Sequence, residues 1–337
     1  RNKISKSSTY EKPQTSDAYV GEYGADVVRL WIASQDFRDD IPVSREILSH
    51  VGDAYRQIRN TLRYQLSVLH DFTAAADAVP LARMHLLDRW ALHQAAVLRQ
   101  ECERAYDAFD FHRVYQLCNQ FCAVTLSATY HDILKDRLYT LAAASPLRRS
   151  SQTAIHGIFD VLVKVLAPVL LFTADEAWAY AQTGTEFTDA PVHLQDWPAE
   201  PAGWRDAGVE ADAAALLSVR AAVNEAIEPL RAAGRLGKSL DAAVTLRVSP
   251  ADPSFPVLEK HRDFLPELFI VSHVSLAALD GTPAGAPAAA DTPPLVGVQP
   301  CSELGHARCP RCWRWVPALV GSGHGEVCPR CAEALTS

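Results

Sequence analysis

The chain has 337 residues, a formal net charge of −8 and an apolar content of 48%. This length is enough for two or three domains with cores of their own. No stretch approaches the roughly 18 uncharged apolar residues of a membrane-spanning helix. The overall acidity argues against a protein that binds nucleic acid through bulk positive charge, although a local basic stripe is compatible with it. We find no charged-then-apolar leader and expect no membrane contact and a cytoplasmic location.

The chain opens with a polar segment, Lys3-Ile4-Ser5-Lys6-Ser7, that carries two lysines three positions apart. It has no apolar period, so we expect a loop that brings two ammonium groups to one polyanion. A disordered chain end is the alternative. The segment Tyr23-Gly24-Ala25-Asp26 leads into a compact apolar run at residues 27–32, which favours an ordered loop followed by a helix. The first residue is Arg1, and we expect a piece of a longer chain.

Residues 43–180 predict long amphipathic helices packed as an antiparallel bundle, and residues 181–210 predict a long connection. In the first of them, apolar residues recur every three or four positions from Ile47 to Leu69. Its other face carries a basic stripe formed by Arg56, Arg59 and Arg63. This stripe is either a solvated face or a row of phosphate contacts along RNA. Farther on, Thr173-Ala174-Asp175-Glu176 fits a capping box, which predicts that Thr173 caps the helix that follows.

Residues 201–295 predict a small α/β module. One helical stripe runs from Leu216 to Leu230, and residues 243–248 alternate like a strand. Residues 264–270 fit a short helix or a second strand, and residues 271–276 fit another strand. Residues 280–294 are rich in alanine, glycine and proline and are typical of a linker or surface loop.

Two cysteine pairs near the end of the chain predict a metal site. Cys309 and Cys312 are two residues apart, and so are Cys328 and Cys331, with 15 residues between the pairs. Each pair forms a tight turn whose sulfurs reach one ion, and two such turns give a tetrahedral four-cysteine zinc site. Four sulfurs leave the metal no open position, so this single Zn²⁺ would be structural. A redox pair or disulfides fit this context less well, and the possible substitute ligands Cys301, His306 and His324 lie outside the turns.

The zinc turns and their surroundings also carry an aromatic and basic set: Arg311, Trp313, Arg314, Trp315 and Arg330. Tryptophan and arginine beside a zinc turn suit stacking and phosphate contact with single-stranded RNA. The alternative is that this zinc-binding segment packs against the rest of the protein, with Trp313 buried in the core. The sequence leaves both interpretations open.

Taken together, these motifs resemble the C-terminal part of the bacterial-type isoleucyl-tRNA synthetases, a class I aminoacyl-tRNA synthetase family. The lysine segment is similar to the family's KMSKS loop, and Cys309-Pro310-Arg311-Cys312-Trp313 to its terminal zinc module. Further resemblance is carried by the segments Arg59-Asn60-Thr61-Leu62-Arg63-Tyr64, Leu87-Asp88-Arg89-Trp90-Ala91-Leu92, Lys135-Asp136-Arg137-Leu138-Tyr139 and Phe172-Thr173-Ala174-Asp175-Glu176-Ala177-Trp178. The loop departs from the family because Ser8-Thr9 stands where Gly-Asn is usual.

The resemblance implies a mainly helical chain in four parts. Residues 1–42 would end a Rossmann-type catalytic domain, residues 43–200 would be the anticodon-binding bundle, residues 201–295 a junction module, and residues 296–337 a zinc module that contacts tRNA. It also implies ATP-dependent attachment of isoleucine to tRNA(Ile) through isoleucyl-adenylate.

The resemblance further implies that Lys6, supported by Lys3, stabilises charge on the triphosphate, and that Ser5 and Ser7 help to bind ATP. Mg²⁺ would assist in the full enzyme, which we expect to be a monomer. Arg56, Arg59, Arg63, Arg311, Trp313 and Arg314 are the candidate tRNA contacts.

The segment that precedes the lysine loop in the family, with the amino-acid pocket and the HIGH motif, would be needed for adenylation. We therefore expect the 337 residues alone to be inactive in that step. A free-standing RNA-binding protein built from synthetase parts is one alternative. A sister synthetase with a different amino-acid specificity is another.

Overall fold

The computed structural model describes residues 15–41, 43–199, 201–279 and 295–336, so the segment Lys3 to Ser7 lies outside the described residues. The chain forms two compact units. The helical unit comprises Arg1–Asp132 and Arg149–Arg205, and the second unit comprises Ile133–Arg148 and Asp206–Ser337. Among the described residues, no helix is long and apolar enough to cross a membrane.

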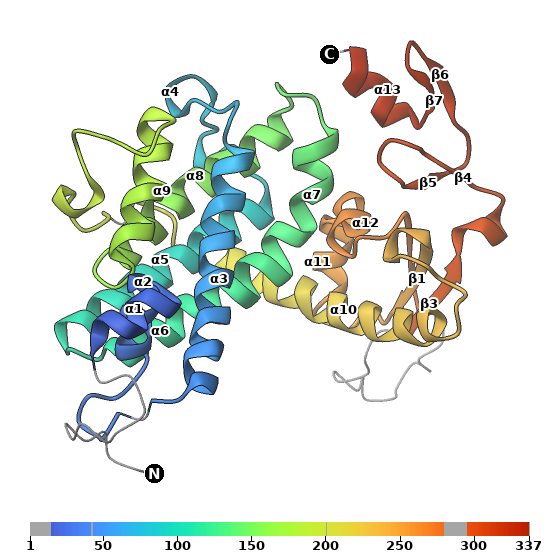
Figure 1. The fold of residues 1–337 in the computed structure, drawn as a ribbon. Helices are drawn as coiled ribbons and strands as arrows, with labels where there is room; N and C mark the ends of the chain where they lie inside the picture. Colours follow the sequence, from blue (N-terminus) through green and yellow to red (C-terminus); the bar gives the residue numbers. More distant parts are fainter. Residues whose placement is uncertain (1–14, 42, 200, 280–294, 337) are drawn as a thin grey trace. The chain divides into compact units, whose positions relative to one another are not determined.

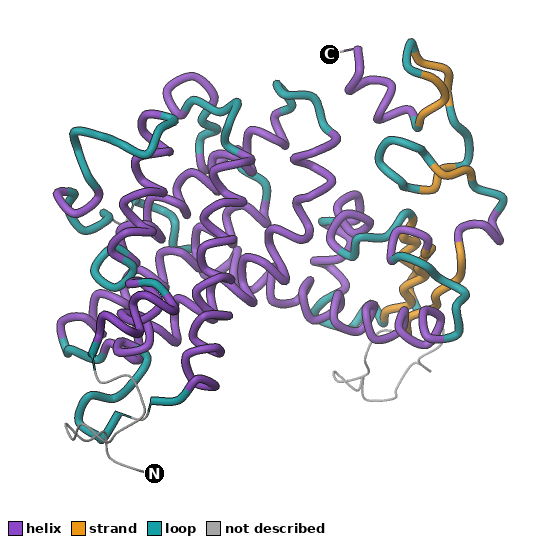
Figure 2. The backbone as a smooth tube through the Cα atoms, in the orientation of Figure 1, coloured by secondary structure: helices purple, strands orange, loops and turns teal. Residues whose placement is uncertain are grey.

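The helical unit is built from helices that share one core (Figure 1, Figure 2). In chain order they are α1 (Ser16–Tyr23), α2 (Ala25–Ala33), α3 (Arg45–Val68), α4 (Ala74–Asp77), the 3₁₀ turn η1 (Leu81–Arg83), α5 (Leu86–Asp107), α6 (Phe111–Gln120), the π-helix η2 (Phe121–Tyr130), α8 (Pro146–Leu166), α9 (Leu171–Thr183) and the 3₁₀ turn η3 (Val192–Leu194). The prediction of a mainly helical region is confirmed.

Helix α3 forms where the apolar period predicted it. The hydroxyl of Ser44 accepts a hydrogen bond from the backbone N–H of Ile47 at 3.2 Å, which caps the first turn. Ile58 and Leu62 are fully buried on the apolar face. On α8, Ile155, Ile158 and Leu162 are likewise removed from solvent, so both long helices contribute their apolar stripes to the core.

The start of α9 corrects the predicted capping box. The helix begins at Leu171, and Thr173 lies inside its first turn. The hydroxyl of Thr173 is hydrogen-bonded to the hydroxyl of Tyr55 at 2.9 Å. The N–H of Thr173 donates instead to the carboxylate of Asp26 at 2.7 Å. The cap therefore comes from a distant helix, α2, because burial against α2 brings a carboxylate to the free N–H groups of α9.

The second unit begins in α7 (His131–Thr140) and continues with α10 (Ala207–Ala232), which precedes a three-stranded sheet. Strand β1 (Ala242–Val248) is central, with β2 (His273–Ala278) parallel to it and β3 (Leu295–Pro300) antiparallel. The short helices α11 (Phe255–Lys260) and α12 (Leu265–Leu268) connect β1 to β2. The strand predicted at residues 243–248 is confirmed, and of the two options for residues 264–270 the structure adopts the helical one.

The end of the chain is held by short elements. After the 3₁₀ turn η6 (Cys301–Leu304), β4 (Ala307–Arg308) pairs with β5 (Trp315–Val316), and β6 (Val320–Ser322) pairs with β7 (Gly325–Val327). Helix α13 (Pro329–Thr336) follows. We call residues 307–336 the metal module. Its core is small and consists mainly of four cysteine side chains with Val327.

Candidate metal centre and nucleic-acid interface

The four predicted ligands come together in the metal module. The sulfur atoms of Cys309, Cys312, Cys328 and Cys331 all lie within 4.8 Å of one another, and all four residues are buried. The sulfurs of Cys312 and Cys328 are 3.6 Å apart. In a tetrahedral site with Zn–S bonds of about 2.3 Å, neighbouring sulfurs are about 3.8 Å apart. The cluster thus fits one tetrahedral ion with soft sulfur ligands, and the prediction of a four-cysteine cluster is confirmed.

Backbone hydrogen bonds shape the two turns. In the first turn, the N–H of Trp313 donates to the carbonyl of Cys309, and the N–H of Cys309 donates to the carbonyl of Arg314, both at 2.9 Å. Trp313, which directly follows Cys312, adopts a left-handed backbone with φ of 66°, a conformation that is uncommon for a bulky residue. The second turn leads into α13, and the N–H of Cys328 donates to the sulfur of Cys309 at 3.3 Å. The N–H of Ala332 donates to the carbonyl of Cys328 at 3.0 Å, so each turn is closed by a hydrogen bond of its own backbone.

The protonation chemistry of the cluster favours a cation. Burial alone would raise the pKa of Cys309, but hydrogen bonds from the backbone of Cys312, Cys328 and Arg311 lower this pKa to about 6. Burial and the neighbouring sulfurs raise the pKa of Cys312 and of Cys328 instead. Without a cation, further thiolates would repel one another in this buried space. A bound divalent metal removes that repulsion and stabilises all four thiolates.

The surface of the metal module presents a tryptophan with two cations near its ring. The Trp313 side chain is 48% exposed. The ammonium of Lys238 lies 4.0 Å from the centroid of its ring, and the guanidinium carbon of Arg308 lies 5.8 Å from it. Within the part of the chain that the structure describes, neither Lys238 nor Arg308 forms an ion pair. We call these three residues the Trp313 patch. An exposed aromatic ring with adjacent positive charge suits a nucleotide base and its phosphate.

The three arginines near the zinc turns make contacts inside the protein. Arg311 donates to the backbone carbonyl of Thr140 at 2.6 Å, Arg314 lies 3.0 Å from the carboxylate of Asp136, and Arg330 donates to both oxygens of Asp136. Burial alone would raise the pKa of Asp136, but the hydrogen bond from Arg330 and the charges of Arg314 and Arg330 hold it below its usual value. Arg311 and Arg314 therefore pack against the protein itself, as one of the two interpretations expected. Trp313 is exposed and does not lie in the core.

The basic stripe on α3 is partly neutralised. Arg56 is hydrogen-bonded to Asp53, one turn earlier, and Arg59 lies 3.9 Å from Glu176. Arg63 is exposed and forms no hydrogen bond or ion pair with any described residue. Of the three arginines predicted to contact RNA, Arg63 is therefore the one with a guanidinium available for a partner.

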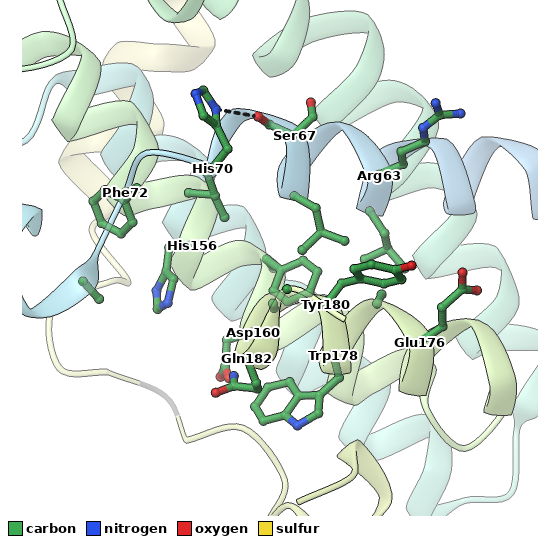
Figure 3. A pocket seen from close by; sticks show the side chains of 18 of the residues that line it. Arg63, Ser67, His70, Phe72, His156, Asp160, Glu176, Trp178, Tyr180 and Gln182 are labelled. Carbon is green, nitrogen blue, oxygen red and sulfur yellow. Dashed lines mark hydrogen bonds between the residues drawn. The ribbon is translucent and has the colours of Figure 1, made fainter. Parts of the chain in front are cut away.

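Arg59 and Arg63 also border a groove of about 1050 Å³ between α3, α8 and α9. Figure 3 shows Glu176 beside the ring of Tyr180, Asp160 and Gln182 beside Trp178, and His70 bonded to the Ser67 carbonyl, while Arg63 points away from Tyr180. Lys164 is paired with Asp160 at 2.8 Å and lies 5.2 Å from the Trp178 ring centroid. Aromatic, acidic and basic side chains all line the groove, so it is not a purely basic binding surface.

Sequence reasoning missed two members of the Trp313 patch. Arg308 directly precedes Cys309, so the sequence did indicate that Arg308 lies beside the zinc turn. Lys238 is 75 positions away from Trp313 in the sequence and reaches the ring through the fold of the second unit. No local pattern marks it.

Comparisons with known proteins give the family context. Residues 88–246 match the family described as the anticodon-binding domain of tRNA ligase. An isoleucine–tRNA ligase of Geobacter sulfurreducens is 42% identical over 321 residues, which cover 94% of this chain and 33% of that protein. The isoleucine–tRNA ligase of Syntrophotalea carbinolica is 41% identical, with the same coverage of both chains.

A crystal structure of a ternary complex of Agrobacterium radiobacter K84 agnB2 LeuRS with tRNA and LeuAMS aligns with 70% of this chain and 23% of its own, at a TM-score of 0.42 and 14% identity. That likeness is too weak to establish a shared fold. The sequence comparisons are much stronger, although the chain spans about one third of the length of the relatives it matches. The chain is thus a relative of the isoleucine–tRNA ligases, similar to them over nearly all of its own length and about a third of theirs.

Proposed function

We propose that the chain supplies the tRNA-recognising part of an isoleucine–tRNA ligase. The observation that carries this proposal is the match of residues 88–246 to the anticodon-binding domain of tRNA ligases, within a chain about 40% identical to isoleucine–tRNA ligases over 94% of its length. The whole enzyme would attach isoleucine to tRNA(Ile) in an ATP-dependent reaction. We place it in the cytoplasm and expect it to act as a monomer.

The lysine loop would contribute to the chemical step. Lys6, supported by Lys3, would stabilise negative charge on the triphosphate while the α-phosphorus is attacked, and Ser5 and Ser7 would help to hold ATP with Mg²⁺. These residues lie outside the described part of the chain, so the proposal for them rests on the resemblance of their sequence to the family loop. Isoleucine itself would bind in a part of the enzyme that this chain does not supply.

The metal of the four-cysteine cluster would be one Zn²⁺ ion. Cys309, Cys312, Cys328 and Cys331 would occupy all four positions, so the ion would hold the module together and would not activate water. The metal module is too small to fold around its few buried apolar side chains alone. The ion would therefore fix the backbone that presents Trp313.

Two surfaces would contact the tRNA. On the metal module, the Trp313 ring would stack on an unpaired base while Lys238 and Arg308 approach the adjacent phosphates. On α3, Arg63 would contact the RNA backbone from an exposed position. The roles of Arg56, Arg59, Arg311 and Arg314 in RNA binding stay predictions, since each of these side chains already has a partner within the protein.

Selective retention of tRNA tests this proposal. The zinc-loaded 337-residue chain is immobilised, incubated with total bacterial tRNA at about 0.15 M salt, and the retained tRNAs are sequenced. We expect enrichment of tRNA(Ile) over the input pool. Retention of all tRNAs in their input proportions would contradict the proposal.

The alternative is a free-standing RNA-binding protein derived from a synthetase. Both functions predict that the 337-residue chain lacks isoleucine-dependent exchange of pyrophosphate into ATP, because the amino-acid pocket is not part of it. They differ in what the gene encodes upstream of Arg1. A contiguous reading frame for a catalytic domain supports the ligase, and a start codon at this point supports the free-standing protein.

A further inference from the structure

Helix α7 carries adjacent residues that bind different parts of the second unit. The carboxylate of Asp136 accepts a hydrogen bond from Arg330 of the metal module. The guanidinium of Arg137 donates to the carboxylate of Glu267 on α12 at 2.7 Å. The Arg137 side chain is fully buried and lies 5.8 Å from the Phe264 ring centroid. Successive residues on a helix point about 100° apart. One turn of α7 therefore contacts both the metal module and the sheet-associated helices.

The contact between Asp136 and the metal module has the geometry of a strong ion pair. Arg330 donates to the two carboxylate oxygens at 2.6 and 2.7 Å, and Arg314 approaches from a second direction at 3.0 Å. The Asp136 side chain is 19% exposed, and those of Arg314 and Arg330 are 17% and 34% exposed, so the pair is partly shielded from water. Bidentate arginine–carboxylate pairs that are shielded from water are among the stronger polar contacts in proteins.

One arginine of the module also contacts a cluster sulfur. Arg311 donates to the sulfur of Cys331 at 3.4 Å, and the same nitrogen donates to the Thr140 carbonyl. A Zn²⁺ ion with four thiolates has a net charge of −2. With such an ion bound, the cluster and Asp136 together would carry −3, which would balance the +3 of Arg311, Arg314 and Arg330. The arginines bridge two negatively charged centres, the metal cluster and α7.

We propose that Asp136 is the docking residue of the metal module: through Arg314 and Arg330 it holds the module on α7, while the four cysteines and their metal hold the module's own fold. Placement and folding of the module are thereby carried by different residues. Asp136 and Thr140 lie on one face of α7, one turn apart, and both receive arginines from the module. Trp315 also ties the module to the second unit, because its indole N–H donates to Asp241 and its backbone N–H donates to Ser272. Asp136, which contacts no ligand, thereby shares with these contacts the orientation of the Trp313 ring. The docking itself does not require RNA, and its consequence for RNA rests on the proposed function.

Hydrogen exchange followed by mass spectrometry tests the docking on the zinc-loaded chain. The variant Asp136→Asn keeps the shape of the side chain and removes its charge. We expect amide exchange in α13 and at residues 307–316 to rise about tenfold or more, since a shielded bidentate pair is lost, while one zinc per chain is retained. The matched control Glu326→Gln, an exposed carboxylate on β7, leaves exchange unchanged.

A second variant checks that the pair acts as a unit. Arg330→Gln alone should raise amide exchange in the same segments. The double variant Asp136→Asn with Arg330→Gln should exchange little faster than the single variant with the larger effect. Unchanged exchange in Asp136→Asn, or loss of zinc from that variant while the helical unit stays folded, would overturn the proposal. A tRNA affinity that stays constant while exchange rises would leave the docking supported and would count against the RNA role of the module.

Discussion

The carboxylate of Asp26 accepts a hydrogen bond from the backbone N–H of Thr173 at 2.7 Å, across 147 positions of the sequence. A second bond comes from the N–H of Phe172 at 3.3 Å. One turn later on α2, Arg29 donates to the carbonyls of Pro168 and Val169 at 2.8 and 2.9 Å. Helix α2 thus supplies an acceptor to free N–H groups at the start of α9 and a donor to the link between α8 and α9.

The first prediction concerns this cap. Asp26→Ala removes the acceptor for the first turn of α9, so we expect a loss of about 1–2 kcal/mol in the free energy of unfolding of the helical unit. Urea unfolding followed by circular dichroism measures the loss, and hydrogen exchange locates it at residues 171–174. Asp26→Asn keeps an acceptor oxygen and should lose less. Equal stability of Asp26→Ala and the unchanged protein would show that the cap contributes nothing.

The second prediction concerns a buried carboxylate in the helical unit. Asp88 is fully buried and accepts hydrogen bonds from the hydroxyls of Tyr130 at 2.7 Å and Ser150 at 2.6 Å. We expect Asp88→Ala to cost about 3–5 kcal/mol, because it leaves a cavity and two buried hydroxyls without their acceptor. Tyr130→Phe removes a single bond and should cost about 1–2 kcal/mol. Urea titrations of both variants check the order, and an Asp88→Ala loss below that of Tyr130→Phe would contradict it.

The third prediction concerns the metal. Atomic emission should find one zinc per chain, and a chelator should raise amide exchange throughout residues 307–336 while α3 and α8 stay protected, because the module's core is too small to persist alone. Cys331→Ser should abolish binding. Cys301→Ser is the control, since Cys301 lies outside the four-sulfur cluster, and it should retain one zinc. A module that stays protected without metal would refute this account of its folding.

The fourth prediction concerns the Trp313 patch. Trp313→Ala should weaken tRNA binding by about 1–3 kcal/mol through the loss of one stacked base, with the metal still bound. Lys238→Ala should lower the slope of the logarithm of affinity against the logarithm of salt concentration by about 1. Fluorescence anisotropy with labelled tRNA measures both. Lys260→Ala, which removes an exposed lysine paired with Asp212, is the control for Lys238→Ala and should leave the slope unchanged.

The cysteine cluster and the long helices were predictable because their causes are local. Two residues between thiolates fix each metal turn, and the three-to-four spacing of apolar side chains on α3 fixes the face that becomes buried. For the same reason the strand at residues 243–248 was predicted from its alternation. In each of these elements the pattern that stabilises the structure is contained in a short stretch of sequence.

What was missed depends on contacts between distant segments. Thr173-Ala174-Asp175-Glu176 satisfies the pattern of a capping box, but the carboxylate of Asp26 takes that place because the fold delivers it there. Arg311 and Arg314 appear as free cations in the sequence, and their partners Thr140 and Asp136 are more than 170 positions away. Neither pairing leaves a local trace in the sequence, so the sequence left open whether those arginines contact RNA or pack on their own protein.

The most direct test of the central claim compares one tRNA(Ile) transcript with the same transcript carrying a changed anticodon, each titrated with the zinc-loaded chain. If the chain is the anticodon-reading part of an isoleucine–tRNA ligase, the change should reduce affinity by about tenfold or more, since contacts to single-stranded bases are lost while backbone contacts remain. Equal affinities for the two transcripts would contradict the account.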